Sequence, residues 1–356
     1  MSVIIYSNTY AEINLKNITK NVKILINEFN NYKYYFGVVK SDCYGHDDIK
    51  TIKAIIDGGC NYLAVATLDE ALEIRKEIND IPILCLGIIP SNYMDVCIKN
   101  NITITINNLS YLNEIIKQET NNLKVHIKLN TGMNRLGTNN KDEFNKMYQI
   151  IKNSDLILEG IYTHIYDANN KDASLKQLNT FKELTKDINL KDIPIIHICA
   201  SDAILNDIYE PFINGCRLGI AMYGLCDNKK LKLHSTFSLY SEVIQINEVE
   251  NETVGYNGAY KVNKKEKIAV VSIGYADGII RKNTNRYVYI NNKPYKIVGN
   301  ICMDMLFVKV DDSVKVNDKV VIIKDNEHIK EIAKHLDTIT YEILCSVGKR
   351  VPRKYI

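Results

Sequence analysis

A short apolar run that ends in a lysine and a glycine-containing turn lies near the start of the chain: Phe36-Gly37-Val38-Val39-Lys40-Ser41-Asp42-Cys43-Tyr44-Gly45-His46. A nearly continuous apolar run before a polar turn is typical of a parallel strand that is buried on both faces. A lysine at the tip of such a strand is partly desolvated, which lowers its pKa and makes it a nucleophilic amine or a base. Schiff-base chemistry with a carbonyl cofactor needs that kind of amine, although most lysines at strand ends are simply solvated.

The same kind of run recurs through the first two-thirds of the chain. The eight runs are residues 35–40, 62–67, 83–88, 102–106, 125–130, 158–164, 195–200 and 216–223, and their starts lie 19 to 37 residues apart. Helical spacing of apolar residues fills several gaps, at residues 15–29, 68–78, 144–151, 175–188 and 203–208. Strand–helix alternation repeated eight times predicts an N-terminal (β/α)8 TIM barrel. A doubly wound sheet is the alternative, because spacing alone does not show that the sheet closes.

The pattern changes after Gly224. Strands without long intervening helices are predicted at residues 239–249, 267–273, 286–290, 296–298, 305–310 and 319–323, with one helix at 329–336. Polar or glycine-bearing turns separate these strands. We therefore predict two domains, an α/β barrel over residues 1–230 and a C-terminal mostly-β domain over residues 231–356.

The composition is that of an ordinary globular protein, with 46% hydrophobic and 24% charged residues. A net charge of +3 is too balanced to favour nucleic acid or a membrane surface as a partner. The nine cysteines are odd in number and form no C-x-x-C pair, so neither a disulfide framework nor a metal site is predicted. No apolar run approaches the roughly 20 residues of a membrane span, and the N-terminus does not resemble a signal peptide. These features predict a protein of the reducing cytoplasm.

Polar side chains stand at the ends of several predicted barrel strands. Lys40 ends the first strand, Lys128 lies near the end of the fifth, and His164 ends the sixth. Ser201 follows the seventh strand, and Arg217 lies in the eighth. The active site of a barrel lies at the C-terminal ends of its strands. Lysine, histidine, serine and arginine at one rim suit an anionic cofactor with a carbonyl group.

These segments resemble the alanine racemase family, in order, from about residue 11 to the end of the chain. Residues 38–46 resemble the family's cofactor-lysine motif, and residues 128–137 resemble its K-x-D-T-G-M-x-R-x-G motif. Residues 163–164 resemble T/S-H-F, and residues 217–224 resemble R-x-G-I…Y-G. Further matches lie at residues 254–260, 273–278, 299–304, 341–345 and 350–353. One match would be weak, but seven or more collinear matches are specific.

The resemblance implies an alanine racemase that interconverts L-alanine and D-alanine by a two-base mechanism on a pyridoxal phosphate aldimine, supplying D-alanine for peptidoglycan. Lys40 would hold the cofactor and act as the base on the D-alanine side. Tyr256, from the other subunit of a homodimer with shared active sites, would be the base on the L-alanine side. A tyrosine ordinarily has a pKa of about 10, so His164 and Arg217 would form the network that assists it. Arg217 would face the pyridine nitrogen and, because it stays protonated, would limit side reactions.

The resemblance also implies the other contacts of pyridoxal 5'-phosphate and of the substrate. Arg135 would contact the cofactor's phenolic oxygen and the substrate carboxylate, and Met303 of the partner subunit would offer its backbone N–H. Lys128 matches a position that is carbamylated in many family members. The phosphate would be held by Tyr44, Ser201, Gly219, Ile220 and Tyr341.

Three positions depart from the family pattern. Asn130 and Asn169 stand where the family usually has aspartate, and Ala200 stands where it usually has asparagine. These departures affect how Lys128 is held, but not the cofactor lysine. Serine or broad-specificity racemisation is a related possibility, against which the bulky Tyr341 argues.

Two further alternatives stay open at this point. A decarboxylase of the same barrel class is one, and the complete segment around Tyr256 argues against it. A non-catalytic pyridoxal phosphate carrier is the other, and the second domain of about 120 residues argues against it.

Overall fold

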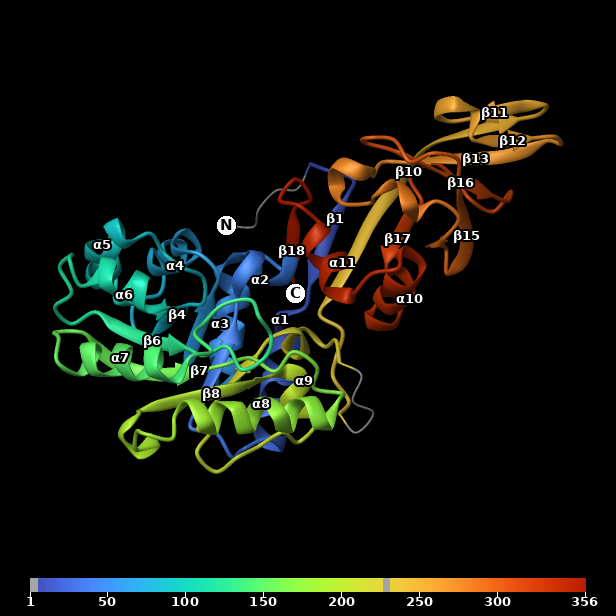
Figure 1. Cartoon of the computed structure of the whole chain (residues 1–356). Coiled ribbons are helices and arrows are strands. Elements are labelled where there is room, and N and C mark those ends of the chain that lie inside the picture. Colours follow the sequence, from blue (N-terminus) through green and yellow to red (C-terminus); the bar gives the residue numbers. More distant parts are fainter. Residues whose placement is uncertain (1–5, 227–230) are drawn as a thin grey trace.

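The computed structural model describes residues 6–226 and 231–356, which form a barrel and a β-rich domain arranged side by side in an elongated molecule (Figure 1). Eight parallel strands close the barrel in chain order, which confirms the predicted (β/α)8 fold and excludes the doubly wound sheet. Strand β2 pairs with both β3 and β9, and this pairing closes the barrel. The barrel strands are β2 (Tyr34–Val38), β3 (Tyr62–Val65), β4 (Ile83–Cys85), β5 (Ile102–Ile106), β6 (Lys124–Lys128), β7 (Ile157–Tyr162), β8 (Ile195–Ala200) and β9 (Gly215–Leu218).

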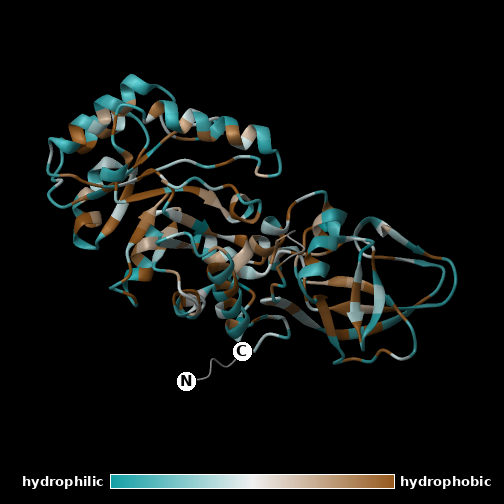
Figure 2. Ribbon diagram, turned by 90° about the horizontal axis from the view of Figure 1, so that it is seen from below, coloured by the Kyte–Doolittle hydropathy of each residue, from teal (hydrophilic) through white to brown (hydrophobic). Residues whose placement is uncertain are grey.

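Helices cover the outside of the barrel, and hydrophobic and hydrophilic residues alternate along their ribbons (Figure 2). Helix α1, for example, buries Ile18, Val22 and Leu25 on one face, as its period of about 3.6 residues predicts. Helices α3, α5 and α6 were not predicted from the sequence, and α5 and α6 are only six and seven residues long. The covering helices are α1 (Leu15–Glu28), α3 (Asp48–Gly58), α4 (Leu68–Arg75), α5 (Met94–Lys99), α6 (Leu109–Ile115), α7 (Lys141–Lys152), α8 (Lys171–Leu184) and α9 (Ser201–Leu205).

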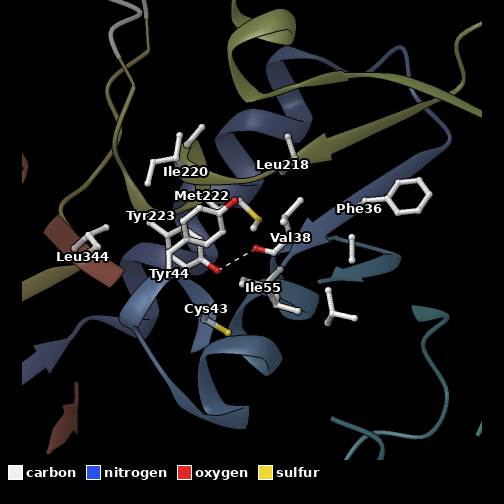
Figure 3. Close-up of a cluster of buried hydrophobic side chains, with 14 of the residues drawn as sticks. Phe36, Val38, Cys43, Tyr44, Ile55, Leu218, Ile220, Met222, Tyr223 and Leu344 are labelled. Carbon is white, nitrogen blue, oxygen red and sulfur yellow. Dashed lines mark hydrogen bonds between the residues drawn. The ribbon is translucent and has the colours of Figure 1, made fainter. Parts of the chain in front are cut away.

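The turn after β2 is a left-handed helical segment, α2 (Lys40–Gly45). Residues 41–44 have φ between 51° and 55° and ψ between 45° and 54°. Left-handed conformation costs about 1–2 kcal/mol for each non-glycine residue, so the surrounding packing must hold it. Cys43 and Tyr44 are buried in the apolar cluster of Figure 3, and the Ser41 N–H donates to Glu70 Oε1 at 2.7 Å. This turn places Lys40 and Tyr44 on the same cavity.

The second domain is built on an eight-stranded, mostly antiparallel sheet in the order β13-β16-β15-β14-β17-β10-β1-β18. All six strands predicted for this domain are present, and the predicted helix corresponds to α10 (Asn326–Leu336). Among the residues that the structure describes, no helix combines the length and apolarity that a bilayer crossing requires. The strands of this region are β10 (Phe237–Val249), β13 (Glu266–Val271), β14 (Tyr287–Ile290), β15 (Lys293–Val298), β16 (Leu306–Val310), β17 (Lys319–Ile323) and β18 (Arg353–Tyr355).

Strand β1 (Tyr10–Ile13) also belongs to this sheet, although residues 1–230 were assigned to the barrel. It runs antiparallel to β10 and parallel to β18. A strand of four residues is too short to show a clear alternation of apolar and polar residues. Its partner strands lie more than 200 residues away, so the sequence around β1 does not reveal the pairing. The predicted boundary near residue 230 lies outside the described residues.

Short elements that the sequence pattern does not predict, β18 among them, complete the second domain. Strands β11 (Glu252–Val254) and β12 (Tyr260–Val262) form a separate hairpin, and α11 (Thr340–Ser346) packs against α2 of the barrel. At this joint a Cβ on Gly45, whose φ is +77°, would lie 2.2 Å from the carbonyl oxygen of Leu344. Only glycine allows this approach, which fixes the second domain at the end of the barrel.

Candidate active site

A cavity of about 460 Å³ lies at the C-terminal ends of the barrel strands, where a barrel carries its active site. The structure brings ten of the predicted site residues together around it. Tyr256 and Met303 do not line it, and they are 69% and 52% exposed on the second domain. The ten residues are Lys40, Tyr44, Lys128, Arg135, His164, Ser201, Arg217, Gly219, Ile220 and Tyr341.

Lys40 lies two residues beyond the end of β2 and is half-buried at the cavity wall. Burial lowers the pKa of its amine, the positive charge of Arg135 lowers it further, and Glu70 acts in the opposite direction. The neutral, nucleophilic form is therefore favoured relative to an exposed lysine.

Glu70 supports this turn, and the sequence analysis missed it. Its carboxylate accepts hydrogen bonds from the backbone N–H groups of Ser41 and Ala66, both at 2.7 Å. It also forms a capping box with Thr67 at the start of α4. The T-x-x-E spacing of that box is the sequence signal that could have identified it.

Arg217 is buried and makes five hydrogen bonds through its two terminal nitrogens. Nη1 donates to His197 Nδ1 at 2.7 Å and to the His197 carbonyl at 2.9 Å. Nη2 donates to the carbonyls of Thr163 and Ile198 at 2.8 and 2.9 Å and to His164 Nδ1 at 3.0 Å. Burial lowers its pKa to about 10, so it stays protonated near neutral pH. Within the described residues no hydrogen bond uses Nε, which remains for a bound group.

His164 is held neutral beside this guanidinium. Burial lowers its pKa to about 2, and the charge of Arg217 is the next cause. Because Arg217 can only donate, Nδ1 of His164 must accept, and the ring proton is therefore on Nε2. Its backbone carbonyl accepts from Gln177 Nε2 at 2.9 Å, which fixes the end of β7.

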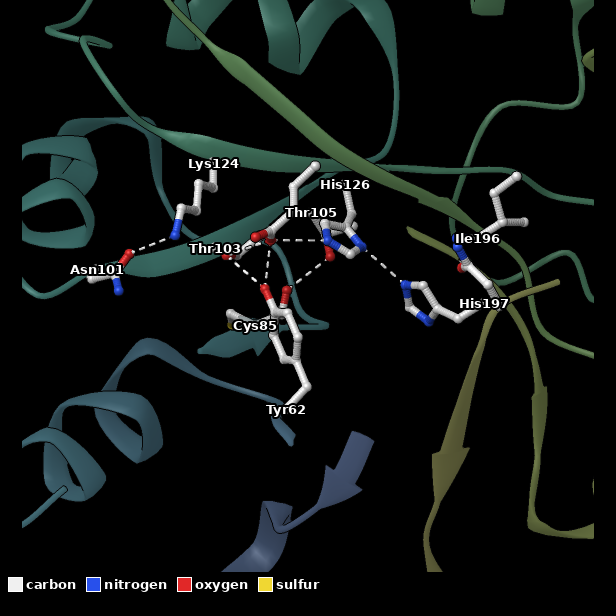
Figure 4. A network of polar contacts seen from close by, with 11 residues as sticks. Tyr62, Cys85, Asn101, Thr103, Thr105, Lys124, His126, Ile196 and His197 are labelled. Carbon is white, nitrogen blue, oxygen red and sulfur yellow. Dashed lines mark hydrogen bonds and ion pairs between the residues drawn. The ribbon is translucent and has the colours of Figure 1, made fainter. Parts of the chain in front are cut away.

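A column of buried polar side chains runs from Arg217 down the barrel interior. Figure 4 shows His197, His126 and Tyr62 of this column. His197 Nε2 lies 2.9 Å from His126 Nδ1, and His126 Nε2 lies 3.2 Å from Glu159 Oε2. Since His197 Nδ1 accepts from Arg217, each ring donates toward Glu159, whose carboxylate also accepts from the Tyr62 hydroxyl at 2.5 Å. These residues were not predicted, although histidines at inward-facing positions of apolar strands were a usable signal.

Lys128 is buried with its Nζ 4.7 Å from the centroid of the Tyr162 ring. Burial lowers the pKa of this amine well below its ordinary value, and the charges of Arg217 and Arg135 lower it further. Asn130, one of the departures from the family pattern, shapes the following loop instead. Its Oδ1 accepts from the N–H groups of Gly132 and residue 134 at 3.2 and 2.9 Å.

The other end of the cavity is a cradle of hydroxyl groups. The Gly219 N–H donates to Ser201 Oγ at 3.0 Å, and a Cβ on Gly219 would lie 3.2 Å from the Tyr44 hydroxyl. A side chain at this position would fill the cradle. The Tyr44 and Tyr341 ring centroids lie 5.9 Å apart beside it. Hydroxyl donors at one end, a lysine amine and the Nε of Arg217 suit the phosphate, aldehyde and ring nitrogen of pyridoxal phosphate, so the residues present fit this cofactor.

The other two departures lie near this end. Ala200 precedes α9 and offers no side-chain cap, whereas Asn169 Oδ1 accepts from Asn206 Nδ2 at 3.3 Å. Ser201 is the first residue of α9, and its Oγ accepts from the Gly219 N–H, so its side chain serves the cavity and not the helix cap. Among the described side chains, no group of three His, Cys, Asp or Glu residues could hold a metal ion.

Tyr256 lies in the tight turn between β11 and β12. Gly255 before it has φ +76° and ψ −178°, a conformation essentially restricted to glycine. The Tyr256 carbonyl accepts from Asn300 Nδ2 at 2.9 Å, which ties the turn to the loop that precedes Met303. The backbone of this turn is thus fixed while the tyrosine ring is exposed.

Comparisons with known proteins cover the whole chain. Residues 13–227 match the family model "Alanine racemase, N-terminal domain", and residues 236–355 match "Alanine racemase, C-terminal domain". Alanine racemase 1 of Bacillus subtilis is 35% identical over 366 residues, covering 99% of this chain and 94% of that protein. The crystal structure of alanine racemase from Bacillus anthracis with bound L-Ala-P superposes with a TM-score of 0.92 at 32% identity, covering 99% of this chain and 96% of that one. The crystal structure of alanine racemase from E. faecalis superposes with a TM-score of 0.92 at 31% identity, covering 100% of this chain and 100% of that one.

Proposed function

The chain belongs to the alanine racemase family of pyridoxal-phosphate-dependent isomerases, and we propose that it moves the α-proton of alanine between Lys40 on one face of the substrate and Tyr256 of the partner subunit on the other. One observation carries this proposal. A single cavity joins the half-buried Lys40 amine to a buried arginine and a hydroxyl cradle, whereas Tyr256 is exposed on a different domain. A racemase needs one proton donor and one proton acceptor on opposite faces of the same carbon.

The residues that would hold pyridoxal phosphate are those that the cavity gathers. Bound there, the group supplies an electron sink that acidifies the α-proton. Lys40 would contribute the amine for its aldehyde, and Arg217 would face its ring nitrogen through Nε. The phosphate would be held by Tyr44, Ser201, Gly219, Ile220 and Tyr341.

Arg217 would act as a donor that keeps its proton. Five acceptors hold its terminal nitrogens, and a pKa of about 10 leaves it charged at neutral pH. It can therefore offer a hydrogen bond without transferring a proton. The neutral His164 beside it carries its own proton on Nε2, so the pair extends a chain of donors toward the side of the cavity where Tyr256 would dock.

The substrate would bind at the rim through Arg135, which is exposed there, and through the backbone N–H of Met303 of the partner subunit. Lys128 would be carbamylated. Burial and the charges of two arginines favour its neutral amine, which is the form that reacts with carbon dioxide. The carbamate formed would be negatively charged and would pair with the arginines. Asn130 leaves that neighbourhood without the usual carboxylate.

A homodimer with shared active sites would complete each cavity. Tyr256 and Met303 are both exposed in the single chain, as side chains that dock into another subunit would be. The nine cysteines are unpaired, which supports the reducing cytoplasm as the location, and D-alanine made there would supply peptidoglycan.

Mixed dimers test this division of labour. Lys40→Ala and Tyr256→Phe chains, each inactive alone, would be combined and assayed for D-alanine by chiral chromatography. About half of random dimers would be mixed, and one of the two sites in each would be intact, so about a quarter of the wild-type activity should return. As a control, Lys40→Ala combined with His164→Ala should recover nothing, because no site would then be intact.

Two results would contradict the proposal. Isolated mixed dimers without activity would mean that Tyr256 does not act across the subunits. A wild-type protein that binds the cofactor but makes no D-alanine from L-alanine would not be an alanine racemase. A panel of L-amino acids, serine included, would then identify a broader or different substrate.

A further inference from the structure

A second cavity, of about 320 Å³, lies in the second domain beside α11. Glu342, Ile343 and Ser346 of α11 line it, whereas Tyr341 of the same helix lines the active cavity. Successive helical residues are rotated by about 100°, so these two sets face different sides of α11. The interior of the second cavity is apolar and buried, and it consists of Ile279, Ile323, Ile332, Leu336, Ile343 and Val347.

One buried cation, Arg286, lines this apolar cavity and is only 5% exposed. Its Nε donates to Asn283 Oδ1 at 2.6 Å, and Nη1 donates to the carbonyls of Ile322 and Tyr287 at 3.1 and 3.2 Å. Its Nη2 has no hydrogen-bond partner among the described residues. No described carboxylate forms an ion pair with the guanidinium.

An unpaired buried charge is costly, and removing one partner of a buried ion pair typically costs several kcal/mol. Three neutral acceptors tie Arg286 to the loop before β14, to the first residue of β14 and to β17, and they account for Nε and Nη1. These three hydrogen bonds neither neutralise the positive charge of Arg286 nor use the donors of Nη2. A bound anion would do both.

We propose that this cavity binds a small organic carboxylate with a branched apolar body, whose carboxylate pairs with Arg286 and whose body contacts the isoleucines. The volume lies at the lower end of the range that small-molecule sites occupy. The exposed Lys282 at the rim adds positive charge, and the Glu342 carboxylate at the rim is occupied by the Thr338 hydroxyl. Two carboxylates, those of Glu342 and the exposed Asp337, disfavour an anion near them, so the anionic end of the ligand would lie inside the cavity at Arg286.

Helix α11 is a wall of both cavities and has little freedom to move independently of either. A Cβ on Gly278 would lie 2.3 Å from the Ser346 carbonyl oxygen, and Leu344 meets Gly45 of α2 just as closely. A ligand in the second cavity would contact the helix that carries Tyr341 to the active cavity.

Methyl NMR of the holoenzyme tests this site independently of racemisation. The probes are 3-methylbutanoate and 3-methylbutanamide, which share a shape but differ in charge. The carboxylate should shift the methyl signals of Ile279, Ile323, Ile332 and Ile343, and the amide should bind at least about tenfold more weakly. Equal binding of the two probes, or no shift of these methyls, would overturn the proposal. Shifts confined to Ile165 and Ile220, which line the active cavity, would overturn it too.

Two variants locate the binding. Arg286→Gln should weaken carboxylate binding at least about tenfold. Because that change could also prevent folding, Ile280→Trp provides a second test at an exposed position of the rim. The larger side chain should block entry and abolish the shifts of the second-cavity methyls while racemisation persists. Undiminished binding in Ile280→Trp would place the ligand elsewhere and overturn the proposal.

Discussion

The cavity at the end of the barrel and the turn that carries Tyr256 differ in how completely one chain builds them. In the cavity, Arg217 is buried with five hydrogen bonds, and Lys40 lies between strand β2 and a turn held by Glu70. In the turn, the backbone is fixed through Asn300, but the ring of Tyr256 is 69% exposed. The first region is preorganised by folding alone, whereas the second needs a surface to dock against. Changes in the two regions should therefore have different consequences.

The strongest test of this difference is the direction of proton exchange. Tyr256→Phe should slow deuterium uptake from solvent into L-alanine by about 10²- to 10⁴-fold, the usual contribution of a positioned acid or base, and should affect uptake into D-alanine far less. Initial exchange rates from each enantiomer in deuterated water measure this. Tyr287→Phe, at another exposed tyrosine of the same domain, is the control and should change neither rate. Equal losses on both sides would show that Tyr256 does not serve one face only.

A second difference between the domains is their response to acid. His46 and His164 have pKa values lowered to about 3 and about 2 by burial, and burial lowers those of His126 and His197 as well. In the second domain, burial lowers the pKa of His328 to about 4. An unfolded histidine has a pKa of about 6.5, so below that pH the unfolded state binds more protons and stability falls as pH falls.

The barrel should therefore loosen first on acidification. Each buried neutral histidine removes up to about 1.4 kcal/mol of stability per pH unit below about 6.5. Hydrogen exchange between about pH 7 and pH 5, corrected for intrinsic rates, should show β2–β9 losing protection before β14–β17. His46→Gln should reduce the pH dependence by about one histidine's share, whatever its effect on absolute stability. Simultaneous loss of protection in both domains would contradict this expectation.

Substitutions at the contact between α2 and α11 test how tightly the barrel and the second domain are packed together. Gly45→Ala would place a Cβ 2.2 Å from the Leu344 carbonyl at a φ of +77°, and it should destabilise the protein by about 3 kcal/mol. Gly348→Ala is the matched control, because nothing lies within 4 Å of its Cβ, and it should stay within about 0.5 kcal/mol of wild type. Urea unfolding of the cofactor-loaded enzyme measures both. Equal effects would mean that the joint is not tightly packed.

The sequence predicted the barrel and most of its rim because both depend on a repeated local pattern. An apolar run followed by a polar residue marks a strand end, and that rule alone led to Lys40 and His164. The strand-end rule could not identify the column of His197, His126 and Glu159 as part of the site. Its contacts join residues that lie 33 and 71 positions apart in the sequence, so no local pattern reveals them. The left-handed conformation of residues 41–44 has no local signal, since tertiary packing imposes it on residues that disfavour it. Helix α11 is only seven residues long, and β1 owes its place to distant partners.

The smallest expected effect on activity comes from Lys128. Whether this residue is carbamylated shows whether folding alone completes the barrel side of the active site. Burial and two arginines favour the neutral amine, which is the form that reacts with carbon dioxide. With ¹³C-labelled bicarbonate, the wild type should show a carbamate signal that Lys128→Ala lacks and that Lys141→Ala, at a surface ion pair, retains. Activity should fall only a few-fold in Lys128→Ala, because the carbamate would position Arg135 and would not itself move a proton. A signal absent from the wild type would mean that Asn130 and its loop hold Arg135 without a carbamate, and that folding alone finishes this half of the site.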